Sequence, residues 1–341
     1  MRLASCVVVA LLMALSTAAR AQSAATVTLT PDGNALAMQL GLMPSDLAKA
    51  IQTDVDNIYQ TNNVGGFLRG FANAVSFSNR GLGVDYVSMP HDFMVGVAAN
   101  VAASSPDYLT GADKPTAGLA PNFGIMLGTN LRGFDYPRWT LFANGFYEKA
   151  ATNALSGHLT SLGAHLQYRL IQPEADGGSA IVLRWIGVDI TSGFEYTKWT
   201  LSAEQQIPSD LPITGPQGSA DLTMNSGGTF NLSATTYTVP VEVSTGLRIV
   251  ELVSVYAGGG ADFTTGTAKI NANLTGDIKT SDGREVGMST ITINGSNTGA
   301  PVMLRGFGGV QLNLWKLKLS VQATVSQEPA VSLNAAIRLV L

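Results

Sequence analysis

Eight side chains that could bind ions, solutes or protons share the polar face of a period-two pattern. They are Asp85, His165, Asp189, Glu195, Glu242, Arg248, Asp262 and Arg305. Successive side chains of a β-strand point to opposite faces of the sheet, so residues two apart share a face. Acidic and basic groups on a common inner face could control the passage of a solute. The same groups could equally form ion pairs that stabilise the sheet, and the pattern leaves both roles open.

The histidines His91, His158 and His165 are the candidate bases for acyl transfer. A nucleophile and its base must come within hydrogen-bond reach, and no local signature around these histidines places a nucleophile there. The stretch "GHLTSLGAHLQ" does not match the motifs around the catalytic histidine of outer-membrane phospholipases and proteases. The histidines and carboxylates also lack metal-ligand spacing. We therefore predict a protein that is not an enzyme, with no catalytic residues, no metal site and no cofactor.

The N-terminus has the features of a secretory signal peptide. Arg2 precedes an apolar run over residues 7–15, and Ala19-Arg20-Ala21 forms a small-x-small cleavage site. Cleavage after Ala21 removes Cys6, the only cysteine, and leaves 18 basic against 24 acidic residues. The mature chain then has no disulfide, and its net charge of −6 argues against a nucleic-acid partner.

Two regular patterns follow the signal peptide. Leu47, Ile51, Val55 and Ile58 predict one amphipathic helix between Pro44 and Gln60. A weaker pattern over residues 67–75 fits a second short helix or a first strand equally well. From about Gly81 onward the period is two, as in β-strands. The stretch "KLKLSVQATVS", residues 316–326, shows it clearly, because its apolar and polar residues alternate throughout.

The predicted connections between strands are short at one end of the sheet and long at the other. Short ones fall near residues 89–91, 250–251 and 314–316, and long polar ones near residues 103–120, 202–235 and 264–301. Outer-membrane barrels with up-and-down topology alternate in this way. The meander predicts ten to fourteen strands, with twelve preferred.

The polar face indicates what covers the apolar face. Only 13% of the residues are charged, against 45% hydrophobic residues and 37 glycines, whereas ordinary soluble domains have about 25% charged residues. The polar face carries mainly Ser, Thr, Asn, Gln and Gly, which suit a lumen. Aromatic residues near the strand ends suit interfacial girdles; they are Trp139, Tyr147, Tyr168, Trp185, Tyr196, Trp199, Tyr237 and Trp315. A soluble secreted β-protein is the alternative, because alternation alone does not identify the medium.

The last strand, residues 331–341, alternates apolar and polar residues up to the final residue. In this respect the chain resembles the Gram-negative outer-membrane β-barrel class, whose C-terminal strand is read by the barrel-assembly machinery. The chain ends in Leu341 where that class usually ends in Phe or Trp, which implies weaker recognition. The order of helix and then barrel also resembles the fatty-acid transporter group, which places an N-terminal segment in the lumen.

The expected fold is therefore all-β, a closed antiparallel up-and-down transmembrane β-barrel with a short N-terminal helical segment. The expected division is a signal peptide over 1–21, a periplasmic or luminal helical segment over 22–79, and a barrel over 80–341. After export we expect it in the Gram-negative outer membrane, with outer-membrane lipid and the barrel-assembly machinery as partners. The leading predicted function is a channel or transporter for a small unidentified solute, hydrophobic solutes included. The alternatives are a structural or surface-interaction barrel with a closed lumen and, third, an outer-membrane lipid hydrolase.

Overall fold

The computed structural model describes residues 20–58, 64–88, 93–105, 118–152, 155–173 and 182–341. Its helices are α2 (Pro31–Gln39), α3 (Pro44–Ile58), α4 (Val64–Phe77) and the 3-10 helix η2 (Arg132–Phe134). Its strands are β1 (Arg20–Leu29), β2 (Phe93–Ser104), β3 (Gly118–Leu131), β4 (Tyr136–Ala151), β5 (Leu155–Ile171), β6 (Leu183–Gly215), β7 (Gly218–Ile249), β8 (Val253–Thr280), β9 (Glu285–Thr298), β10 (Val302–Leu314), β11 (Leu317–Ser326) and β12 (Ala330–Val340).

The described strands form one antiparallel sheet of twelve strands that closes on itself. The order is β1-β9-β8-β10-β11-β12-β2-β3-β4-β5-β6-β7, and β7 also pairs with β8. That second pairing closes a ring of the ten strands from β8 through β12 and β2 to β7 and leaves β9 and β1 outside it. Closure satisfies the backbone hydrogen bonds of every strand in the ring, which a bilayer requires. The predicted fold class is confirmed, with a ring at the lower limit of the predicted range.

The outer wall of the ring is apolar and exposed, and its inner wall is polar and buried. On the outside, Val97, Ile125, Leu162 and Leu333 each keep more than half of their surface exposed, and the other strands of the ring show the same alternation. Soluble monomers rarely expose apolar patches larger than a few hundred Å². The exposed apolar surface here extends around the whole ring, so hydrocarbon is the medium that suits it.

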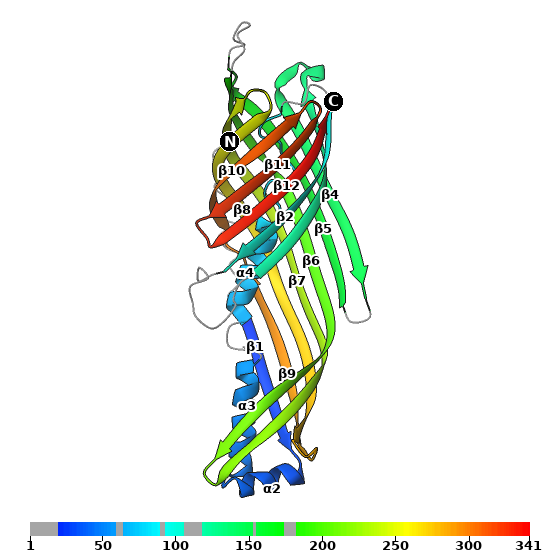
Figure 1. Cartoon of the computed structure of the whole chain (residues 1–341), viewed down its shortest axis with the longest axis vertical. Coiled ribbons are helices and arrows are strands. Elements are labelled where there is room, and N and C mark those ends of the chain that lie inside the picture. The colour runs from blue at the N-terminus through cyan, green and yellow to red at the C-terminus, as the bar shows by residue number, and fades with distance from the viewer. Residues whose placement is uncertain (1–19, 59–63, 89–92, 106–117, 153–154, 174–181) are drawn as a thin grey trace, which may run out of the picture.

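Strands β6, β7 and β8 continue well beyond the ring at one end of the molecule (Figure 1). Beyond the ring they pair with β9, which in turn pairs with β1. We call this part the extension, namely β1, α2, α3, β9, residues 204–215 of β6, residues 218–229 of β7 and residues 264–280 of β8. We call the opposite end of the barrel, with the short β3–β4, β7–β8 and β10–β11 connections and the C-terminus, the turn end.

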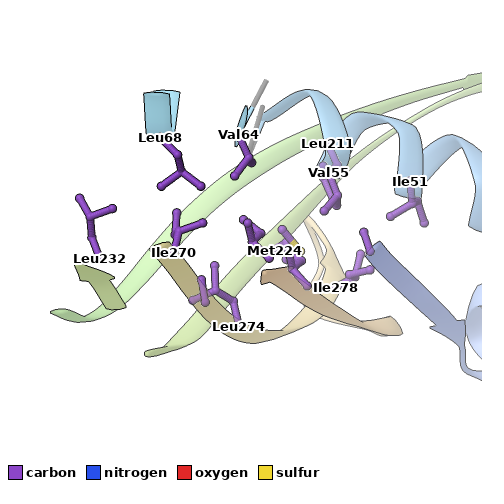
Figure 2. Close-up of a cluster of buried hydrophobic side chains, with 14 of the residues drawn as sticks. Ile51, Val55, Val64, Leu68, Leu211, Met224, Leu232, Ile270, Leu274 and Ile278 are labelled. Carbon is purple, nitrogen blue, oxygen red and sulfur yellow. The ribbon is translucent and has the colours of Figure 1, made fainter. Parts of the chain in front are cut away.

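Helices cover one face of the extension and give it a hydrophobic core. Leu47, Ile51 and Val55 of α3, one helical turn apart, are fully buried. They pack among apolar side chains of the long strands, including Leu211 and Met224 (Figure 2). Helix α2 lies at the far tip of the extension, and α4 lies nearest the ring (Figure 1). None of the helices in the described part of the chain is long and apolar enough to cross a bilayer.

The prediction of long polar connections is wrong for two stretches, which belong to strands instead. Residues 202–235 form the ends of β6 and β7 that meet at the tip of the extension. Residues 264–301 include the outer half of β8 and all of β9. Both stretches keep the period-two alternation, but their outward residues are mainly polar or charged, such as Glu204, Thr223, Asn271 and Asp277, instead of large apolar residues. A strand that leaves the bilayer needs no apolar outer face, and its polarity therefore looks like that of a loop.

Two helices agree with the sequence-based expectation, whereas three other elements and one aromatic residue do not. The helix predicted between Pro44 and Gln60 is α3, and the ambiguous stretch 67–75 belongs to helix α4. Strands β1 and β3 and helix α2 were not predicted. Trp199 is not part of an aromatic girdle, because its ring packs edge-on against Phe71 of α4, 5.4 Å between centroids.

Candidate functional site: the occupied lumen

The lumen of the ring contains part of the same chain, which we call the plug: α4 and the segment Ser78–Ser88 that follows it. Nearly every described residue from Val64 to Ser88 is buried. Helix α4 enters at the extended end of the ring, where its backbone passes close to the first residue of β3. A Cβ atom on Gly118 would lie 2.3 Å from the Cα and N atoms of Phe71, so only glycine allows this approach.

Side-chain amides of the barrel wall hold the segment after α4. Asn100 of β2 donates hydrogen bonds to the carbonyl oxygens of Ser78, at 2.7 Å, and Arg80, at 3.0 Å. Asn79 of the plug donates to the Oγ1 atom of Thr197 on β6, at 2.7 Å. The two Asn100 bonds satisfy irregular backbone inside the barrel, where buried carbonyl groups need a partner.

Four of the predicted lumen-lining residues meet around a residue that was not predicted, Arg80. Arg80 pairs with Glu195 of β6 and, at 3.0 Å, with Asp262 of β8. Arg305 of β10 pairs with the same Asp262 at 2.9 Å and with Glu242 of β7 at 2.6 Å. No side chain of this network is more than 4% exposed. Two arginines and three carboxylates therefore join the plug to four strands of the wall, β6, β7, β8 and β10.

His165 lies beside this network and has no described nucleophile. Its Nε2 atom is 3.7 Å from Glu195 Oε1. In the part of the chain that the structure describes, no hydroxyl group is hydrogen-bonded to the His165 ring, and the Nδ1 atom has no partner. A Cβ atom on Gly83 of the plug would lie 2.8 Å from His165 Nε2. The imidazole therefore packs closely against the plug.

Asp85 does not lie on a barrel strand but caps a turn within the plug. Its Oδ1 atom accepts hydrogen bonds from the backbone N–H groups of Val87, at 2.9 Å, and Ser88, at 2.7 Å. Arg338 of β12 holds the same turn. Its Nη2 atom donates to the Val84 carbonyl at 3.0 Å, and its Nη1 atom lies 3.6 Å from Asp85 Oδ2.

Aromatic packing fixes the plug next to this turn. The Tyr86 ring lies 4.7 Å from the Phe307 ring and 5.4 Å from the Tyr256 ring, measured between centroids. All three side chains are buried. Rings at these separations are in favourable aromatic contact, so side chains fill the lumen around Tyr86.

The two remaining predicted residues lie apart from the network. Asp189 of β6 forms a two-bond ion pair with Arg169 of β5, at 2.7 and 2.9 Å. Arg248 lies at the turn end and pairs with Glu251 at 3.0 Å. It lines a cavity of about 400 Å³ at that end, whose other lining residues include Arg184, Trp185, Trp315, Lys316 and Lys318.

The structure thus brings together Glu195, Glu242, Asp262, Arg305 and His165, and places Asp85, Asp189 and Arg248 nearer the turn end. Sequence reasoning missed Arg80 and Arg338 as lumen residues. Among the described residues, no group of three or more His, Cys, Asp or Glu side chains is arranged to hold a metal ion. The arrangement is one of mutual neutralisation: the two arginines and three carboxylates of the network compensate one another, and Asp85 and Asp189 face Arg338 and Arg169.

The closed ring, its exposed apolar outer wall and its polar, buried interior define a class, the outer-membrane β-barrels. Residues 22–341 match the family model described as Lsa36-like. The chain belongs to the Lsa36-like family. No curated protein matches the sequence.

Solved structures similar to this chain are also outer-membrane proteins. The translocator domain of the autotransporter NalP from Neisseria meningitidis is 9% identical, covers 84% of this chain and 95% of its own, and has a TM-score of 0.29. The attachment invasion locus protein Ail of Yersinia pestis is 12% identical, covers 73% of this chain and 97% of its own, and has a TM-score of 0.25. A Pseudomonas aeruginosa FadL homologue is 9% identical, covers 80% of this chain and 97% of its own, and has a TM-score of 0.23. At these TM-scores the likeness carries no argument, and the class assignment depends on the ring and its two walls.

Proposed function

We propose that this protein is a closed barrel that anchors the extension at the outer membrane, where the extension serves in structural or surface interactions. The observation that carries the proposal is the plug. The chain itself fills the lumen, and buried ion pairs link Arg80 to strands β6 and β8. Breaking such pairs leaves buried charges without partners, which is strongly unfavourable. A plug held in this way favours a closed lumen rather than an open pore.

The length of the strands supports an anchoring role. Strand β6 has 33 residues, whereas about 9–11 residues cross the hydrocarbon. The remainder builds a sheet with a helix-covered core outside the membrane. In this proposal the N-terminal unit includes the plug through Ser88, and the barrel begins with β2.

The leading prediction from the sequence, a channel or transporter for a small solute, stays the second candidate. The cavity at the turn end supports it, because Arg184, Arg248, Lys316 and Lys318 line an opening that suits an anionic solute. Transport through this lumen requires the plug to move.

Planar-bilayer conductance separates the two candidates. We expect the purified wild-type protein to insert without sustained conductance. The variant Arg80→Met loosens the plug, so we expect it to conduct, which shows that insertion itself succeeded. Sustained conductance of the wild-type protein, together with uptake of solutes into liposomes, would contradict the closed anchor and favour the transporter.

A further inference from the structure

A belt of basic side chains lies on the outer wall, just beyond the aromatic residues at the extended end of the ring. On β4, Lys149 lies two residues beyond Tyr147, and on β6, Lys198 lies two residues beyond Tyr196. On β8, Lys269 pairs with Ser233. All three lysines are exposed. Interfacial aromatic residues mark the level of the lipid headgroups, so the lysines lie at or just above that level.

The register of the strands brings these side chains onto neighbouring rows. Lys149 is directly opposite His158 on β5, and His158 is opposite Thr200 on β6, two residues from Lys198. Thr200 is opposite Ser233, the partner of Lys269. Since neighbouring strands are about 4.8 Å apart, the belt crosses the five strands β4 to β8 within roughly 20 Å.

The lysines of this belt are not neutralised within the described part of the chain. No described carboxylate pairs with Lys149, Lys198 or Lys269, in contrast to the neutralised arginines of the lumen. Glu148 lies next to Lys149 in sequence but on the opposite face of β4. The partners that a lysine meets at headgroup level are phosphates, which bind ammonium groups as point charges.

Toward the tip of the extension, the same outward face becomes mainly polar, with hydroxyl and amide groups and with carboxylates such as Glu204 and Asp277. Asn231, Asn271 and Asn294 lie side by side on β7, β8 and β9. Ser202 donates to Asn231 at 2.7 Å, and Asn271 donates to Asn294 at 2.6 Å. On the side of the belt toward the turn end, the outward face is the apolar wall of the barrel. From the turn end toward the tip of the extension, the outward side chains of these strands are therefore first apolar, then aromatic, then cationic, and finally mostly hydroxyl and amide groups.

We propose that this face binds a phosphorylated glycolipid of the outer leaflet. Its acyl chains lie against the apolar wall, its phosphates contact Lys149, Lys198 and Lys269, and its sugars contact the hydroxyl and amide surface. The apolar wall is already the interface with lipid, and the belt extends it with the charge that phosphate requires. At the turn end the described strands stop at the aromatic level, and the described residues there form no comparable sugar-facing surface. The assignment places the extended end in the outer leaflet.

Native mass spectrometry in detergent, with diphosphoryl lipid A as the probe, tests the proposal. We expect the wild-type protein to retain lipid A, and the triple variant Lys149→Gln, Lys198→Gln and Lys269→Gln to bind it at least tenfold more weakly. Monophosphoryl lipid A should bind with intermediate strength. The matched control is Lys279→Gln, an exposed lysine on the same face at the far end of β8, which should bind as wild type. Heat-modifiable migration in gels verifies that every variant is folded.

Phosphatidylglycerol separates a glycolipid site from a general affinity for anionic lipid. We expect weak binding that the triple substitution does not change. Unchanged lipid A binding by the triple variant would overturn the proposal, as would an equal loss in Lys279→Gln. An equal loss of lipid A and phosphatidylglycerol binding would show a site for any anionic lipid, which also contradicts it.

Discussion

At the scale of single residues, the most informative side chain is Arg80, whose charge is enclosed by the barrel. It contacts Glu195 and Asp262, residues more than 100 positions away in the sequence. Arg305 balances the remaining carboxylate, so the network is arranged around two cations at its centre. The charge on the plug, and not a regular structural element, is what matches this segment to the wall.

We expect Arg80→Met to lower the free energy of unfolding by about 3–5 kcal/mol, because Glu195 and Asp262 then lose a buried partner. Urea unfolding in detergent, followed by tryptophan fluorescence, measures the change. The control is Arg284→Met, which removes an exposed arginine paired with Asp282 and should leave the unfolding midpoint unchanged. Equal midpoints for wild type and Arg80→Met would mean that the buried pairs contribute nothing to stability.

Gly118 tests the close approach of α4 to β3. We expect Gly118→Ala to cost about 1–3 kcal/mol, since the added methyl group overlaps the Phe71 backbone and overpacks the site. Gly133→Ala is the matched control, because its Cβ atom would have no neighbour within 4 Å. A Gly118→Ala protein with wild-type thermal stability in detergent would show that the helix can shift without loss.

At the scale of elements, α3 and α4 serve two different structures. Helix α3 packs its apolar stripe on the extension, whereas α4 leads into the lumen. A helix that buries one stripe derives most of its stability from packing. The extension and the barrel can therefore lose stability separately, although the long strands are common to both.

Substitution of Leu47, which is fully buried in α3, separates these two structures. We expect Leu47→Ala to destabilise the extension by about 2–5 kcal/mol through the cavity it leaves. Limited proteolysis should then cut the extension faster, while the heat-modifiable migration of the barrel is retained. Lys49→Ala, an exposed change in the same helix, should alter neither. Loss of heat-modifiable migration in Leu47→Ala would show that the barrel depends on the extension.

The final strand offers a test of assembly. Strand β12 pairs with both β11 and β2, and Leu341 stands where the outer-membrane barrel class usually has an aromatic residue. We expect Leu341→Phe to increase the assembled fraction in outer membranes, measured by cell fractionation and heat-modifiable migration. Leu314→Phe adds the same ring at another outward position of the turn end and should have no effect. An unchanged fraction for Leu341→Phe would indicate that recognition does not depend on the last side chain.

At the scale of the whole molecule, the arrangement of plug and extension defines a direction across the membrane. The chain passes from the extension through the lumen and begins β2 at the turn end (Figure 1). Outer-membrane barrels have their short turns in the periplasm and their longer connections outside the cell. On this rule the extension faces the cell exterior, which agrees with the glycolipid belt proposed for its base.

Single-cysteine labelling tests this orientation, because the only cysteine of the sequence, Cys6, lies in the predicted signal peptide. We expect Ser219→Cys, exposed near the tip of the β6–β7 hairpin, to react with a membrane-impermeant maleimide on intact cells. Lys316→Cys, exposed at the turn end, should react only after the outer membrane is permeabilised. The opposite pattern of labelling would place the extension in the periplasm.

The sequence by itself determined the fold class and which way the side chains face. The period-two alternation assigns every residue of a strand to one face, and the scarcity of charge on both faces identifies lipid and lumen. For Glu195, Glu242, Asp262 and Arg305, the inward orientation follows from the alternation alone. The helix α3 follows from its apolar spacing in the same way.

Only the tertiary structure decided what occupies the lumen. The plug has no period that relates it to the wall, and its partners come from strands far away in sequence, so Arg80 and Arg338 could not be matched with carboxylates or carbonyls beforehand. The number of strands in the ring and the length of β6 to β8 were likewise hidden, because a strand outside the bilayer loses its apolar outer face while its backbone continues unchanged. Alternation reports the local direction of side chains, whereas register and closure depend on pairings between distant segments.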